Sequence, residues 1–133
     1  MTHLRTTAFT LFFVIGTGVA SLIALPVILF GERATRLAVR LWAQAMLGGL
    51  RVLCGVSYRV EGREFIPTGG AVVAANHQSM WETIALFAIL ERPVVVLKKE
   101  LLKIPVYGWW AKRTGNIPID RAAGARAARA LMQ

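Results

Sequence analysis

An uncharged, almost wholly apolar segment near the N-terminus constrains this chain more than any other feature. Residues 6–31 contain no charged side chain, and the run from Thr6 to Phe30 is nearly all apolar. A helix rises about 1.5 Å per residue and about 20 residues span the hydrocarbon core, so this segment is long enough to cross a membrane with some tilt. Pro26 is expected to kink it locally, which membrane helices tolerate.

Two other interpretations of this segment stay open. It could be a cleaved signal peptide with Arg5 as its basic region and a cut after Ala20, although its apolar run exceeds the ~7–15 residues of a signal core. It could also form two short apolar halves that dip into the membrane and return. Arg5 stands alone before the segment, whereas Arg33 and Arg36 follow it closely. Because basic residues collect on the cytoplasmic side, we expect the bulk of the chain at the cytoplasmic face of the inner membrane.

The composition favours a membrane partner. Of the 133 residues 56% are hydrophobic, and 16 Lys and Arg against 7 Asp and Glu give a net charge of +9. Such a charge suits nucleic acid or an anionic lipid surface, and the apolar content favours the lipid. No nucleic-acid-binding motif is recognisable. The single cysteine, Cys54, cannot form an internal disulfide.

Residues 32–54 are predicted to form an amphipathic helix. Arg33, Arg36 and Arg40 recur at helical spacing and Trp42 lies near the apolar side, a pattern typical of a helix in the headgroup region. An ordinary amphipathic helix with a solvated charged face fits equally. Gly55 is expected to end it.

The remaining chain alternates between strand and helix patterns. Strands are predicted at residues 56–60, 71–75, 94–97 and 116–120, and a helix is predicted at 79–90. Residues 100–113 are expected to be helical or irregular, and another helix to start at Ala122. This alternation predicts a layered α/β domain, so the chain divides into an anchor (1–31), an interfacial helix (32–55) and an α/β region (56–133).

The segment Asn76-His77-Gln78-Ser79-Met80-Trp81-Glu82 carries the candidate chemistry, because it lies where a predicted strand gives way to a helix. His77 and Glu82 are five residues apart, so they can meet only if the helix begins between them. Ser79 with Glu82 fits a capping box, which would leave His77 in the preceding turn. The spacing alone is also compatible with a simple capping glutamate beside an ordinary histidine.

This segment resembles the His-x4-Asp block of the 1-acyl-glycerol-3-phosphate acyltransferase family, with Glu in place of Asp. Residues 98–101 and 104–109 resemble the segment that joins its blocks, and Gly115 to Arg121 resembles its second block. The three matches occur in order over residues 56–121. The family's third block, a Glu-Gly-Thr-Arg sequence, has no match. We therefore expect either a fragment of a longer enzyme or a truncated, non-catalytic membrane-binding protein.

The resemblance implies acyl transfer from acyl-CoA or acyl carrier protein to the free hydroxyl of a lysophospholipid. It implies His77 as the general base and Glu82 as the residue that orients it. Arg121 would pair with the acceptor's phosphate, although a surface ion pair with Asp120 is the alternative. Gly115 and Lys98 are the other candidate substrate-binding residues. The sequence contains no metal-ligand cluster and no glycine-rich phosphate loop, so it implies no cofactor. The sequence does not specify the length of the acyl chain, which lysolipid accepts it or the oligomeric state of the protein.

Overall fold

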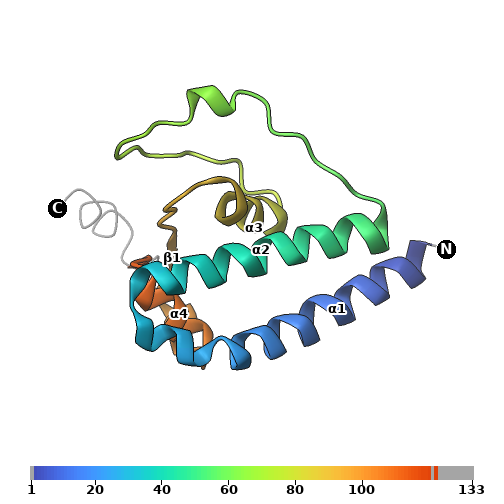
Figure 1. The fold of residues 1–133 in the computed structure, drawn as a ribbon, viewed down its shortest axis with the longest axis horizontal. Helices are drawn as coiled ribbons and strands as arrows, with labels where there is room; N and C mark the ends of the chain where they lie inside the picture. Colours follow the sequence, from blue (N-terminus) through green and yellow to red (C-terminus); the bar gives the residue numbers. More distant parts are fainter. Residues whose placement is uncertain (1, 121, 123–133) are drawn as a thin grey trace.

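The computed structural model describes residues 2–120 and residue 122 and is mostly helical with a small parallel sheet (Figure 1). The helix predicted from Ala122 onward and the candidate phosphate-binding Arg121 fall on residues 121 and 123–133, outside the described part. The layered α/β architecture therefore remains a prediction beyond the small sheet that the structure contains.

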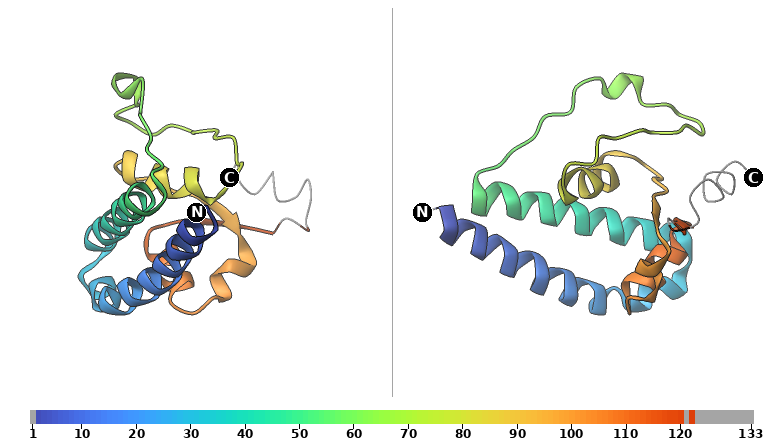
Figure 2. Two further views of the ribbon diagram at one scale, coloured as in Figure 1. Left: turned by 90° about the vertical axis from the view of Figure 1, so that its right-hand side faces the viewer. Right: turned by 180° about the vertical axis from the view of Figure 1, so that it is seen from behind.

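The first two helices form an antiparallel hairpin. Helix α1 (Thr2–Ile23) is followed by the 3₁₀ helix η1 (Leu25–Phe30) and by α2 (Glu32–Cys54), which runs back alongside α1 (Figure 2). Because proline cannot continue a helix, α1 ends before Pro26 and the chain turns there, rather than kinking as predicted. Gly55, in the left-handed conformation at φ 72°, ends α2 as predicted.

Contacts along the hairpin hold the two helices close. The ring of Phe12 lies over Gly49, where a Cβ would come within 2.2 Å of it. The indole N–H of Trp42 donates to the Thr17 hydroxyl at 3.1 Å, so one polar pair joins the helices inside an apolar contact. Near the open end, the Cys54 sulfur lies 3.6 Å from the Arg5 carbonyl oxygen, which places the start of α1 beside the end of α2.

Both helices of the hairpin have the length and apolarity that a membrane span requires. None of the apolar window of α1 is buried inside the protein, whereas part of α2 is covered. Signal sequences and core helices of soluble proteins share these properties.

Helix α3 (Met80–Ile89) packs on the other side of α2 and forms the core with it. The buried residues of this core are all apolar, and three of them are alanines: Ala43, Met46, Leu47, Ile84, Ala85 and Ala88. Alanines on both helices let the two backbones approach closely, so the start of α3 is fixed against the hairpin.

The sheet consists of β1 (Val96–Lys98) and β2 (Ile117–Ile119), which pair in parallel with Leu97 opposite Pro118. The connection contains η3 (Lys99–Lys103) and α4 (Tyr107–Arg113). Pro118 lacks an N–H and is tolerated because β2 has only one strand neighbour in the described part of the chain.

The strands predicted at residues 56–60 and 71–75 are wrong in this structure. Residues 56–79 form a long extended loop with one 3₁₀ turn, η2 (Arg63–Phe65), and Val72 is 99% exposed (Figure 1). An apolar run supplies the side-chain pattern of a strand, but a strand also needs a neighbour to bond its N–H and C=O groups. No described segment pairs with this loop.

Arg36 departs from the predicted basic stripe. Its guanidinium turns inward and donates to the carbonyl oxygens of Pro93 at 3.1 Å and Thr114 at 2.7 Å, and it also bonds Glu32. Arg33 remains exposed on the same helix. The carbonyls that hold Arg36 are 57 and 78 residues away in sequence, so helical spacing could not reveal them.

Candidate functional site

The site lies at the N-terminus of α3, where Ser79 is the N-cap residue, as predicted. The Ser79 hydroxyl accepts a hydrogen bond from the Trp81 N–H at 3.1 Å. The Glu82 carboxylate accepts from the Ser79 backbone N–H at 3.2 Å and from its hydroxyl at 3.3 Å. This reciprocal capping box satisfies N–H groups that a helix start leaves unbonded, and it fixes one carboxylate oxygen of Glu82.

The other carboxylate oxygen of Glu82 contacts Nδ1 of His77. His77 lies in the turn before α3, and folding back over the first turn brings its ring to a residue five positions ahead. The His77 side chain is 73% exposed and that of Glu82 is 17% exposed. The carboxylate is therefore shielded while the ring remains open to a reactant.

Glu82 is held in its ionised form. Burial by itself would raise the pKa of Glu82, but the hydrogen bonds from its own N–H, from His77 and from the Ser79 N–H outweigh burial. The pKa of Glu82 consequently lies below its ordinary value of 4.5. The positive end of α3 also favours a carboxylate in this position.

This pair has the geometry of a general base. When Nδ1–H donates to Glu82, the lone pair of the neutral imidazole is on Nε2, which is free to accept a proton. The fixed carboxylate then stabilises the imidazolium that forms. Such a pair serves reactions in which a hydroxyl must lose its proton as it attacks.

The other sequence-predicted residues are not bonded to this pair in the described part of the chain. Lys98 ends β1 and its ammonium lies 4.0 Å from the Glu100 carboxylate. Gly115 follows α4 at φ 77°, a conformation that favours glycine, and a Cβ there would lie 3.6 Å from Arg36. Arg121 lies outside the described residues.

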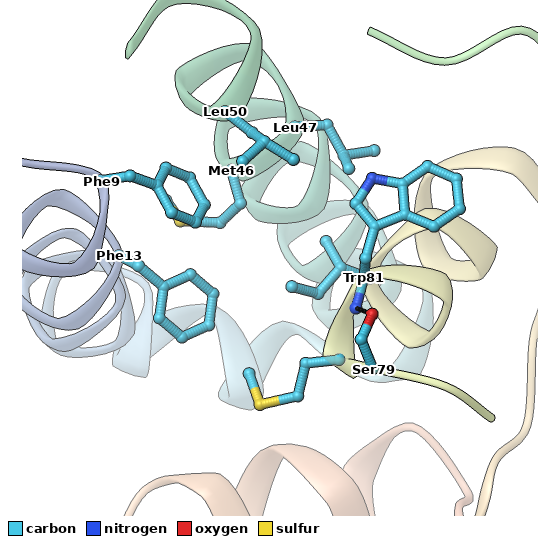
Figure 3. A pocket seen from close by; sticks show the side chains of 9 residues that line it. Phe9, Phe13, Met46, Leu47, Leu50, Ser79 and Trp81 are labelled. Carbon is cyan, nitrogen blue, oxygen red and sulfur yellow. Dashed lines mark hydrogen bonds between the residues drawn. The ribbon is translucent and has the colours of Figure 1, made fainter. Parts of the chain in front are cut away.

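An apolar hollow of about 270 Å³ lies next to the capping box (Figure 3). Phe9 and Phe13 of α1 face it from one side, and Ser79 and Trp81 face it from the other. Its lining consists of Phe9, Phe13, Met46, Leu47, Leu50, Ser79, Met80, Trp81 and Ile84.

Sequence reasoning missed both this hollow and the role of Asn116. The Asn116 side-chain oxygen accepts from the Val95 N–H at 2.9 Å, which extends the bonding of the sheet beyond β1. The two phenylalanines of the hollow, four residues apart on α1, belong to a run whose composition indicates only lipid contact. Their i, i+4 spacing is the available signal, because such residues share one helix face.

Within residues 2–120 and residue 122, no group of three or more His, Cys, Asp or Glu side chains is placed to hold a metal ion.

Comparison with known proteins gives a consistent result. The model of the Acyltransferase family matches residues 57–133, more than half of the chain. A 1-acyl-sn-glycerol-3-phosphate acyltransferase of Pseudomonas aeruginosa is 37% identical over 105 residues, which cover 79% of this chain and 40% of that protein. The proteins of the same name from Salmonella typhimurium and Escherichia coli K12 are each 37% identical, over 62% and 58% of this chain.

The chain spans less than half the length of these relatives: the matches cover 40%, 32% and 30% of them. No solved structure matches the chain.

Proposed function

Because this chain belongs to the Acyltransferase family, we propose that it transfers a fatty acyl chain from a thioester to the free hydroxyl of 1-acyl-glycerol-3-phosphate. The donor is acyl-CoA or acyl carrier protein. The single observation that carries this proposal is the contact between His77 Nδ1 and the Glu82 carboxylate at the start of α3. The names of the relatives supply the substrate class.

His77 acts as the general base in the first step. Its Nε2 accepts the proton of the acceptor hydroxyl while that oxygen attacks the thioester carbonyl and forms a carbon–oxygen bond. Glu82 remains ionised, keeps the ring in the productive tautomer and stabilises the imidazolium. An imidazole can both accept and release a proton at working pH, as a general base must.

The second step releases the carrier. The tetrahedral intermediate collapses, its carbon–sulfur bond breaks, and the thiolate leaves with the electron pair. The imidazolium returns a proton to that sulfur, so His77 is neutral again and the atoms balance. No nucleophile from the protein is needed, because the substrate alcohol attacks directly.

Three further residues contribute to substrate binding in this proposal. Arg121 pairs with the acceptor phosphate, for which its forked guanidinium is well shaped. Gly115 lies just before β2 and Lys98 is the last residue of β1, where Lys98 meets anionic groups of the lipid or of the donor. The longer side chain of Glu82, relative to the family's Asp, keeps the orienting role.

The hairpin attaches the protein to the membrane in this proposal. Exposed apolar side chains, among them Leu11, Val14 and Ile15 on α1 and Leu29 and Phe30 on η1, supply an apolar face for lipid contact. We place the remaining chain at the cytoplasmic face of the inner membrane, where an anionic surface suits the net charge of +9.

Membranes that contain the full chain should transfer an acyl group from acyl-CoA to lysophosphatidic acid. His77→Ala should lower the rate by at least about 10²-fold, the usual contribution of a general base. Glu82→Asp should retain much of the activity, because the carboxylate is preserved. His3→Ala is the matched control, since His3 is an exposed histidine in the first turn of α1.

Unchanged transfer by the His77 variant would contradict the catalytic assignment. No transfer by the unaltered chain, together with tight binding to vesicles, would instead support a non-catalytic membrane-binding protein.

A further inference from the structure

The apolar hollow beside the capping box has the chemistry of a hydrocarbon site. Eight of its nine lining residues have apolar side chains or are the indole of Trp81. The exception is Ser79, whose hydroxyl already binds the Trp81 N–H and the Glu82 carboxylate. The lining contains no charged side chain, and about 270 Å³ is close to the ~300 Å³ at which ligand pockets begin. The hollow therefore suits part of an alkyl chain.

The hollow lies close to His77 and Glu82, the proposed base and its partner. Ser79 lines the hollow, binds Glu82 through its N–H and hydroxyl, and Glu82 contacts His77. The hollow and the base thus share one helix start. A chain bound in the hollow would have its polar end beside His77.

The residues that form the walls indicate whether the hollow takes the acyl chain of the acceptor or that of the donor. Phe9 and Phe13 come from α1 and Met46, Leu47 and Leu50 from α2, so the hairpin forms more than half of the lining (Figure 3). Helix α1 also exposes apolar side chains on its outer face, among them Leu11, Val14 and Ile15, so the helix that forms one wall of the hollow also contacts lipid in the proposed function. A lipid that already resides in the membrane can move along the hairpin into the hollow without exposing its chain to water. A donor on a water-soluble carrier has no such route.

We propose that this hollow binds the acyl chain that the lysolipid acceptor already carries and so presents the free hydroxyl to His77. The inference rests on the proposed function for the identity of the lipid. It gives α1 a second role, because this helix both contacts the membrane and forms one wall of the acceptor site. The phosphate headgroup stays outside the hollow, where the charge of +9 favours it.

Photo-crosslinking tests this binding separately from turnover. The full chain in lipid nanodiscs is exposed to lysophosphatidic acid with a diazirine near the end of its chain, and labelled peptides are mapped by mass spectrometry. We expect the labelling that unlabelled lysophosphatidic acid competes away to fall on Phe13, Met46 and Ile84, and to persist in His77→Ala. Competed labelling confined to Leu11 and Ile15 on the outer face of α1 would overturn the proposal.

A probe made from the acyl donor distinguishes the acyl chain of the donor from that of the acceptor. A non-hydrolysable thioester analogue with the same diazirine should leave the hollow unlabelled. Labelling of the hollow by this analogue instead of the lysolipid would show that it takes the donor chain, and would overturn the assignment. Loss of transfer with the labelling intact would count against the proposed function alone.

Filling the hollow provides a second measurement. Met80 lines it yet is 60% exposed, so Met80→Trp should fold. Exclusion of about two methylenes should raise the KM for long-chain lysophosphatidic acid roughly tenfold, from the burial free energy of a CH₂ group, and leave a short-chain acceptor unaffected. Val52→Trp, at an 82% exposed position of α2 outside the hollow, is the matched control. No change in the KM for the long-chain acceptor in Met80→Trp, or a change by the same factor for both acceptor lengths, would contradict the proposal.

Discussion

Arg36 shows how one side chain can join distant parts of this protein. Its side chain is only 14% exposed, and its donors are divided between the Glu32 carboxylate on the same helix and two backbone carbonyls outside it. Pro93 lies shortly before β1, and Thr114 is the C-cap residue of α4. Arg36 therefore fastens the start of α2 to both segments that lead into the sheet.

Replacement of Arg36 by methionine should destabilise the fold. The variant keeps an aliphatic stem but leaves the Pro93 and Thr114 carbonyls without their donor, and hydrogen bonds from charged groups are worth about 2 kcal/mol each. We expect the free energy of unfolding, measured by urea titration in detergent, to fall by roughly that amount or more.

Arg33→Met is the control, since the Arg33 side chain is exposed and has no hydrogen bond or ion pair to another described residue. A similar loss in both variants would indicate that net charge, and not the two carbonyls, sets the effect.

At the scale of elements, helix α2 of the hairpin contains two adjacent glycines that have different surroundings. At Gly49 a Cβ would lie 2.2 Å from the ring of Phe12, whereas at Gly48 nothing lies within 4 Å. Gly49 thus lets the α1 side chain lie against the backbone of α2. Gly48 has no such contact and only weakens the helix.

Alanine at these two positions should have opposite effects. Gly48→Ala should stabilise the protein by about 1 kcal/mol, the helix propensity difference between the two residues. Gly49→Ala should destabilise it despite the same propensity gain, because Phe12 must move away and the hairpin contact opens. Thermal unfolding of both variants followed by circular dichroism checks this. Equal shifts in the same direction would show that Phe12 does not pack on Gly49.

The elements differ in how well the sequence predicts them. The start of α3 at Ser79 and the end of α2 at Gly55 can be predicted, because capping is decided by residues within one turn. The strands expected at 56–60 and 71–75 do not form, because strand pairing is decided by a distant partner. Val106 is also unforeseen: it adopts φ 66° in a tight turn closed by a 2.7 Å bond from the Tyr107 N–H to the Pro105 carbonyl, where a β-branched residue is strained.

The same distinction applies to the candidate site. The contact of His77 with Glu82 follows from placing a helix start between them, which is a local argument. The inward turn of Arg36 and the wall that Phe9 and Phe13 give to the hollow depend on how α1, α2 and α3 pack. No periodicity within a single segment contains that information.

At the scale of the whole molecule, the hairpin determines which parts would share one side of the membrane that we propose it enters. A single crossing by the first segment would put the N-terminus and the end of α2 on opposite sides. The antiparallel packing instead brings the Cys54 sulfur to within 3.6 Å of the Arg5 carbonyl oxygen. The two ends of the hairpin must therefore share one side.

Labelling in sealed vesicles checks this arrangement. An impermeant maleimide that reacts with Cys54 should do so from the same side on which a tag at the N-terminus is cut by protease. Cys54 is the only cysteine of the chain, so the thiol signal is unambiguous. Accessibility from opposite sides would contradict the hairpin in the membrane.

The packing of α1 on α2 also has a consequence for how the protein is made. Synthesis runs from the N-terminus at about 5–20 residues per second, so both helices leave the ribosome before the segments that follow them. Their contacts lie within the first 54 residues and need nothing that follows. We expect the hairpin to close and meet lipid while the later segments are still being translated. Helix α3 would then fold onto a surface already docked at the bilayer, and the proposed base would be assembled where the proposed lipid substrate resides.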